Sequence, residues 1–233
     1  MYSLMKNLIL LRHGQSEWNL ENRFTGWTDV ELSPKGREEA RHAGELIAAL
    51  GLKPRYCFTS YLRRAIQTLD IALDAMDRMW LPVVKDWHLN ERHYGALQGL
   101  NKAATAEKYG DEQVHIWRRS YDVAPPALQA DDERFPGSEE RYALLGKDSL
   151  PLTESLKDTV ARVKPCWEEL IAPALGIYDT VFVAAHGNSL RALVMMLLGK
   201  TPDEIVAEEI PTGVPRVLEL TDRLEVKSDR YLK

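Results

Sequence analysis

The stretch Leu8-Ile9-Leu10-Leu11-Arg12-His13-Gly14 decides the fold, together with its counterpart Val181-Phe182-Val183-Ala184-Ala185-His186-Gly187. Each contains an apolar run with the length and composition of a buried strand, and a His-Gly pair follows the run. Glycine lets the chain turn sharply after the histidine, and open α/β sheets bind ligands at the carboxyl ends of their strands. If the two strands are neighbours, we expect both imidazoles to face one pocket, with the guanidinium of Arg12 beside them.

Helices and strands alternate outward from the first stretch. A helix is expected at residues 33–51, because a Ser-Pro pair suits an N-cap and a first helical position, and a glycine closes the pattern. A short strand is expected at 56–59, followed by a helix that Ser60 begins and that runs to about residue 76. Residues 81–84 fit a short edge strand, since proline is tolerated at its start.

The strand pattern lapses from Glu91 to about Thr153. A long irregular stretch inside a domain is usually disordered or functional, and the cluster Trp117-Arg118-Arg119 favours a cap over the site. Further elements are predicted as helices at 102–109, 111–119, 156–171 and 190–198, and as strands at 180–185 and 216–220. We therefore predict one domain over residues 1–233, a three-layer α/β/α sandwich with a largely parallel central sheet and a helical and loop cap insertion at about 92–153.

Composition restricts the class of protein. The 233 residues are 45% hydrophobic and carry a net charge of −5, which argues against a general nucleic-acid or anionic-membrane surface. The sequence has no apolar run of about 18 residues and no signal peptide at its start, so we expect a cytoplasmic protein without a membrane partner. Cys57 and Cys166 are interpreted as small buried hydrophobic residues, so redox chemistry is not expected.

The candidate site residues suit phosphoryl transfer through a phosphohistidine. Neutral imidazole is a good nucleophile toward phosphorus if the charge on the phosphoryl oxygens is neutralised and the leaving oxygen is protonated. Arg12 and Arg64 can neutralise the charge, and Glu91 is a candidate proton donor and acceptor. The two arginines should also lower the pKa of His13 and keep it nucleophilic. The other histidines have no clustered carboxylates or cysteines, so no metal is expected.

Four segments resemble the signature segments of cofactor-dependent phosphoglycerate mutase, a family of the histidine phosphatase superfamily. They are Leu11-Arg12-His13-Gly14-Gln15-Ser16-Glu17-Trp18-Asn19, Arg23-Phe24-Thr25-Gly26-Trp27, Asn90-Glu91-Arg92-His93-Tyr94-Gly95-Ala96-Leu97-Gln98-Gly99 and Ala185-His186-Gly187-Asn188-Ser189. The Arg-His-Gly segment alone indicates only the superfamily, which includes many phosphatases. The segment that begins at Asn90 and the Trp117-Arg118-Arg119 cluster point to the mutase.

The resemblance implies that His13 carries a phosphoryl group between the 2- and 3-hydroxyls of glycerate, after 2,3-bisphosphoglycerate has charged the enzyme. It implies that Glu91 is the general acid and base, and that His186 stabilises the transferring group with Arg12 and Arg64. Asn19, Thr25, Gly26 and Gly187 would complete the phosphoryl site, and Arg92, Tyr94, Lys102, Arg118, Arg119 and Asn188 would hold the substrate's carboxylate and second phosphate. Its partners would be small phosphoglycerates of glycolysis and gluconeogenesis, in a homodimer or homotetramer without a metal.

Two alternatives stay open. In a phosphatase of the same superfamily, water attacks the phosphohistidine instead of a second hydroxyl. A catalytically inactive scaffold is the remote alternative, and it should have lost a nucleophile or a phosphate-binding arginine. Members of the mutase family usually continue past the final strand into a mobile tail over the site, whereas this sequence ends at Lys233. Either the sequence is trimmed or closure is weaker, and the second case predicts more hydrolysis relative to mutase turnover.

Overall fold

The centre of the fold is one six-stranded sheet, seen in the computed structural model that describes residues 5–233. Its strand order is β3-β2-β4-β1-β5-β6. The strands are β1 (Lys6–Arg12), β2 (Tyr56–Thr59), β3 (Val83–Lys85), β4 (Thr180–Ala185), β5 (Arg216–Leu220) and β6 (Val226–Tyr231). Strands β1 to β4 run parallel to one another, and β5 and β6 add an antiparallel edge. The largely parallel sheet that the sequence predicts is thus present.

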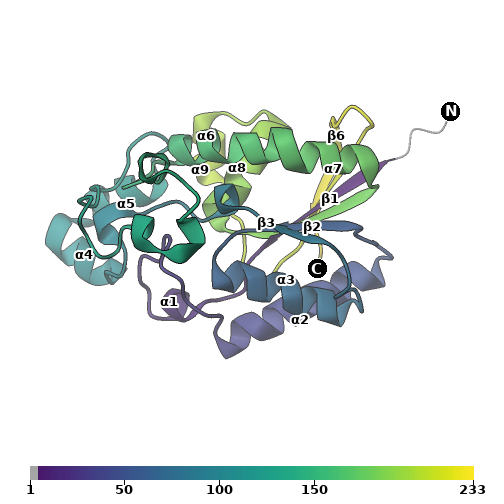
Figure 1. Cartoon of the computed structure of the whole chain (residues 1–233), viewed down its shortest axis with the longest axis horizontal. Helices are drawn as coiled ribbons and strands as arrows, with labels where there is room; N and C mark the ends of the chain where they lie inside the picture. Colours follow the sequence, from purple (N-terminus) through teal and green to yellow (C-terminus); the bar gives the residue numbers. More distant parts are fainter. Residues whose placement is uncertain (1–4) are drawn as a thin grey trace.

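Helices cover both faces of this sheet, as Figure 1 shows. Helices α2 (Pro34–Ala49) and α3 (Arg63–Ala75) lie on one face. The other face carries α6 (Leu156–Cys166), a π-helical turn (Trp167–Ile171), α7 (Ala172–Ile177) and α8 (Gly187–Leu198).

Alternate residues of β1 point to opposite faces of the sheet, as the pleat of a strand requires. Ile9 and Leu11 therefore join the core under α2 and α3, while Leu8 and Leu10 join the core under α6 and α8. The predicted three-layer sandwich is confirmed.

The segment between β3 and α6 lies beyond one end of the sheet. It contains α4 (Lys102–Tyr109) and α5 (Asp111–Arg119), both at the predicted bounds. Short 3₁₀ helices occupy Trp87–Leu89, Gly95–Leu97, Pro136–Ser138, Glu140–Tyr142 and Lys147–Ser149.

Several predicted boundaries differ from the structure. Helix α3 begins at Arg63, since the hydroxyl of Ser60 bonds the ring of His186 instead of capping the helix. The helix predicted to end at residue 171 continues through the π-helical turn to Ile177, and α8 begins at Gly187 rather than at residue 190. Pattern reading places helix ends poorly because polar first turns, such as that of α8, lack an apolar signal.

The sequence pattern does not predict two short α-helices and one strand, namely α1 (Glu17–Leu20), α9 (Pro202–Ala207) and β6. The two helices are too short for a helical period, and β6 is an edge strand with a charged, mostly exposed face. Cys57 and Cys166 are free and buried, as predicted. Among the described residues, no helix has the length and apolar character needed to span a bilayer, and the cytoplasmic location stays a prediction.

Candidate active site

The two histidines meet at the carboxyl edge of the sheet. Strands β1 and β4 pair in parallel with Arg12 opposite Ala185, and the backbone N–H of His13 donates to the carbonyl of Ala185 at 3.0 Å. The imidazole centroids of His13 and His186 are 5.0 Å apart with an angle of 61° between the ring planes. Both side chains are buried. The expectation that the two imidazoles face each other is confirmed.

The tautomer of His13 follows from its hydrogen bond. Its Nδ1 lies 2.7 Å from the carbonyl oxygen of Gly14, and a carbonyl only accepts, so Nδ1 carries the proton. The lone pair is therefore on Nε2, which accepts from Nε of Arg64 at 3.3 Å. Burial lowers the pKa of His13 well below its usual value, and the charges of Arg64 and Arg12 lower it further. The ring is neutral at pH 7, as predicted, although burial is a larger cause than the arginines.

Arginine side chains surround the two rings. Arg64 is buried in the first turn of α3 and donates to the carbonyls of Gly26 at 2.8 Å and Thr28 at 3.0 Å. Burial lowers the pKa of Arg64 to about 10, so it is still a cation at neutral pH. Arg12 donates to the carbonyl of Ile210 at 2.7 Å, while its Nε is a buried donor without a partner in the described structure. A buried donor of this kind is suited to an anionic ligand.

Glu91 accepts three hydrogen bonds at Oε1. They come from the backbone N–H of Arg92 at 2.8 Å and from the backbone and side-chain nitrogens of Asn188 at 3.1 and 2.9 Å. Burial favours the neutral carboxyl, but these bonds and the charges of Arg12 and Arg64 outweigh it and lower the pKa of Glu91. The carboxyl is therefore ionised in the free protein. Bringing a phosphate dianion beside it would raise its pKa and favour protonation.

A cavity of about 70 Å³ opens in front of these groups, and we call it the inner pocket. Since one water needs roughly 10–15 Å³, the cavity has room for one tetrahedral oxyanion. It is lined by Arg12, His13, Asn19, Arg23, Phe24, Thr25, Gly26, Arg64, Glu91, Tyr94 and Lys102. His186 adjoins it through the ring of His13, and a side chain at Gly187 would contact the guanidinium of Arg12 at 3.6 Å. The structure thus brings together the predicted phosphoryl-site residues.

The residues predicted to hold the rest of the substrate divide into two groups. Tyr94 and Lys102 line the inner pocket. A second hollow of about 10 Å³, the outer basic pocket, is lined by Arg92, Arg118, Arg119, Ser120, Leu156, Asn188, Arg191 and Val206. It has room for about one water, so a larger anion requires its side chains to move apart. Asn188 thus connects the two pockets, because it also bonds Glu91.

Arg191 is the residue of the outer basic pocket that the sequence analysis missed. It donates to Oδ1 of Asn188 at 3.2 Å and to the carbonyl of Glu208 at 2.9 Å, and burial lowers its pKa. An arginine three residues after Asn188, within an otherwise apolar helix, was the available signal. Arg92 also has a buried Nε without a partner among the described residues, and its guanidinium lies 4.6 Å from the ring centroid of Tyr94.

A wider groove of about 520 Å³ is lined mainly by residues of α4 and α5. Lys102 lines both this groove and the inner pocket, and Arg118 lines both this groove and the outer basic pocket. The cap helices therefore border all three hollows. Within residues 5–233 no group of three or more His, Cys, Asp or Glu side chains is placed to hold a metal ion.

Comparison with known proteins identifies relatives across nearly the whole chain. The profile of the histidine phosphatase superfamily, branch 1, matches residues 8–227. The structure of a mycobacterial glucosyl-3-phosphoglycerate phosphatase is 26% identical, with a TM-score of 0.72 and 97% of each chain covered. A mycobacterial hydrolase is 27% identical, with a TM-score of 0.75 and coverage of 98% of this chain and 99% of that one.

A third structure shares the fold at lower identity. It is that of a putative α-ribazole-5′-phosphate phosphatase from Escherichia coli, which is 20% identical with a TM-score of 0.73. The alignment covers 98% of this chain and 96% of that chain.

Proposed function

The chain belongs to the histidine phosphatase superfamily, and from this premise we propose that it is a phosphatase that hydrolyses phosphomonoesters through a phosphohistidine on His13. The observation that carries the proposal is the neutral Nε2 of His13, which faces a cavity of oxyanion size bordered by the guanidinium groups of Arg12 and Arg64. The similarity to a mycobacterial glucosyl-3-phosphoglycerate phosphatase supports hydrolysis better than the mutase reaction that the sequence resemblance implies.

In the first step Nε2 of His13 attacks phosphorus, a P–N bond forms and the ester P–O bond breaks. Glu91, protonated once the phosphate is bound, gives its proton to the leaving alkoxide. Arg12, Arg64 and His186 stabilise the charge on the transferring group. In the second step water attacks phosphorus, the P–N bond breaks and the Glu91 carboxylate takes the proton from the water. Phosphate then leaves, Glu91 releases its proton to the solvent because the neighbouring negative charge is gone, and the enzyme returns to its starting state.

The outer basic pocket supports a substrate class. Its four arginines carry positive charge on a protein whose net charge is −5, and Arg92 keeps a buried donor without a partner in the described structure. Guanidinium groups bind carboxylates and phosphates through forked hydrogen bonds. We therefore expect a small phosphomonoester whose alcohol carries a second anionic group.

Phosphoglycerate mutase is the second candidate function. It is favoured by the position of Asn188, which lines the outer basic pocket and bonds Glu91 of the inner pocket. The inner pocket suits the transferring phosphoryl group, and the charge of the outer basic pocket suits another anion. Both pockets fit the charges of 2,3-bisphosphoglycerate, the priming donor that the mutase reaction requires. In that case a second hydroxyl of glycerate would accept the phosphoryl group in place of water.

One assay separates these functions. The protein is given 3-phosphoglycerate with and without a trace of 2,3-bisphosphoglycerate, and 2-phosphoglycerate and free phosphate are followed together. Phosphate release that is lost in His13→Ala, without isomerisation, supports the phosphatase. Isomerisation that needs 2,3-bisphosphoglycerate and releases little phosphate would overturn it in favour of the mutase. Absence of vanadate binding to the intact protein would favour the inactive scaffold.

A further inference from the structure

We propose that Arg162 is a positioning residue that sets the orientation of the Glu91 carboxyl by holding the backbone of residues 87–93. This role rests on the proposed function, because it acts through the proton that Glu91 transfers. Arg162 lies on α6, it is buried, and it lines none of the three hollows described above.

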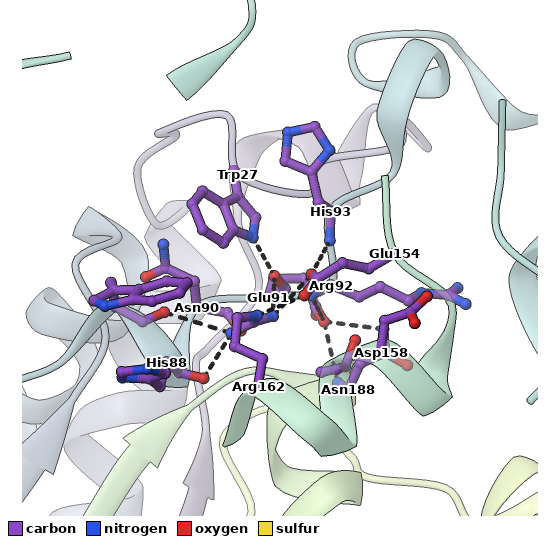
Figure 2. A network of polar contacts seen from close by, with 12 residues as sticks. Trp27, His88, Asn90, Glu91, Arg92, His93, Glu154, Asp158, Arg162 and Asn188 are labelled. Carbon is purple, nitrogen blue, oxygen red and sulfur yellow. Dashed lines mark hydrogen bonds and ion pairs between the residues drawn. The ribbon is translucent and has the colours of Figure 1, made fainter. Parts of the chain in front are cut away.

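Arg162 donates to consecutive parts of the loop that carries Glu91 (Figure 2). Its Nη1 donates to the carbonyls of His88 at 2.6 Å and Asn90 at 3.2 Å, and its Nη2 donates to the carbonyl of Glu91 at 3.1 Å. A guanidinium has five N–H donors in a rigid fork, so one side chain can satisfy several carbonyls in a fixed arrangement. The peptide unit that begins at the Glu91 carbonyl is therefore anchored directly.

Glu154 extends this anchor to the far side of Glu91. Nε of Arg162 donates to its Oε1 at 2.6 Å and Nη2 donates to its Oε2 at 2.9 Å. Oε2 also accepts the backbone N–H of His93 at 2.8 Å. The pair thus holds the loop before and after Glu91, and only 6% and 4% of the two side chains are exposed. We call Arg162 and Glu154 the loop anchor.

Trp27 completes the arrangement. Its indole N–H donates to the carbonyl of Glu91 at 2.5 Å, and its ring lies 5.5 Å from the guanidinium of Arg162. The Glu91 carbonyl therefore has two donors that prevent rotation of its peptide unit. The next N–H in that unit, from Arg92, is one of the three donors to the Glu91 carboxylate. Fixing the peptide unit fixes this donor, and through it the carboxyl.

A contribution to the stability of the fold does not by itself explain why Arg162 and Glu154 form a buried ion pair. Replacing a buried ion pair with uncharged groups is often neutral for stability, whereas removing one partner strongly destabilises the fold. The test variant is therefore Arg162→Met combined with Glu154→Gln, which leaves no unpaired charge and keeps an acceptor for the N–H of His93. The matched control is Arg216→Met combined with Asp229→Asn, because Arg216 is also buried and forms a forked ion pair with Asp229, but lies in β5. Glu208, which also pairs with Arg216, keeps Lys200 as a partner in this control.

The decisive readout is the dependence on the leaving group. General acid catalysis contributes about 10²- to 10⁴-fold, and it matters most when the leaving alkoxide is basic. The constant to compare is kcat/KM, which reports only the steps up to formation of the phosphohistidine and not its hydrolysis, for which Glu91 is the base. For glycerol phosphate we expect kcat/KM of the double variant to fall on the order of 100-fold, as an ångström of misplacement costs about that much. For p-nitrophenyl phosphate, whose leaving group needs no proton, we expect a fall of less than about threefold, with vanadate affinity similarly preserved.

The same double substitution in a Glu91→Gln background should cause no further loss on glycerol phosphate, since the group it positions is gone. Equal losses on both esters, losses that add to those of Glu91→Gln, or a selective loss in the control Arg216→Met with Asp229→Asn would each overturn the proposal.

A separate measurement keeps the inference apart from the proposed function. If the wild-type protein hydrolyses neither ester, or if His13→Ala retains hydrolysis, the proposed function fails. The Glu91 carboxyl can still be titrated by ¹³C NMR, with Glu91→Gln used for assignment. Positioning then requires the pKa of Glu91 to be higher in the double variant, because the N–H of Arg92, one of its three donors, is no longer held in place. An unchanged titration would refute positioning by Arg162.

Discussion

The inner pocket and the outer basic pocket are held in place in different ways. Arg64 is fixed to the carbonyls of Gly26 and Thr28, and His13 follows directly from a buried strand. By contrast, Arg118 is exposed at the end of α5, and Arg119 pairs with an exposed carboxylate of Glu209 at 3.1 Å. Reaction chemistry needs groups fixed before the substrate arrives, whereas side chains on a cap can adapt to it. This difference fits the proposal that the inner pocket performs the chemistry and that the outer one chooses the substrate.

Replacing His13 should abolish catalysis in the inner pocket. His13→Ala removes the nucleophile, and we expect kcat to fall by on the order of 10⁴-fold or more on every ester. The measurement is release of inorganic phosphate, with His42→Ala on the exposed face of α2 as the control. A residual rate within tenfold of the wild type would show that another group attacks phosphorus.

Glu91→Gln tests the proton transfer within the same pocket. We expect a loss of about 10²- to 10⁴-fold on alkyl phosphates. Because the pKa of Glu91 is lowered, its protonated fraction grows as pH falls, while His13 stays neutral because its pKa is also lowered. The wild-type kcat/KM should therefore rise from pH 8 to pH 6, by up to about tenfold per pH unit. If Glu91→Gln keeps the same rise, another group supplies the proton.

The combined change Arg118→Ala and Arg119→Ala tests the role of the outer basic pocket. Each charge-assisted hydrogen bond contributes about 1.5–3 kcal/mol, so KM for 3-phosphoglycerate should rise roughly 10- to 100-fold. KM for p-nitrophenyl phosphate, which has no second anionic group, should change by less than about threefold by the same reasoning. Arg37→Ala, at an exposed ion pair on α2, is the control. A similar rise for both substrates would place these arginines at the transferring phosphate.

The smallest expected effect concerns acid stability. Burial is the first cause that lowers the pKa of His13, His186 and His93, the last to about 3. Below pH 6.5 the unfolded chain binds protons at these positions that the folded protein does not, so stability falls as pH falls.

Each such histidine contributes about 1.4 kcal/mol to the loss between pH 7.5 and 5.5. His13→Asn should reduce that loss by the same amount in urea unfolding. An unchanged pH dependence would mean that His13 is protonated in the folded protein.

The strands and the inner pocket could be predicted because their signals are local. An apolar run followed by His-Gly places a side chain at a sheet edge without any knowledge of distant residues, and the pairing of β1 with β4 then brings the two rings together. The position of Lys102 beside the inner pocket depends on how α4 is placed beyond the end of the sheet, which no local pattern encodes. The position of Tyr94 beside the same pocket likewise depends on tertiary packing.

Arg162 was missed for a different reason. It acts on backbone carbonyls, and these are the same atoms in every residue, so no pattern in the sequence marks which carbonyls will lie opposite an arginine. Strand β6 was missed because its alternating face carries charges in place of apolar residues. The π-helical turn that prolongs the helix after Cys166 likewise has no periodic signal.

The order of strands in the sheet has a consequence for synthesis of the chain. Strand β1 is made first, yet its neighbours in the sheet are β4 and β5, which begin at Thr180 and Arg216. Contacts between such distant residues form slowly, because the entropy of closing a long loop is lost before the contacts stabilise the chain. Until β4 has left the ribosome, β1 is an apolar strand with both edges open, which is an arrangement prone to aggregation.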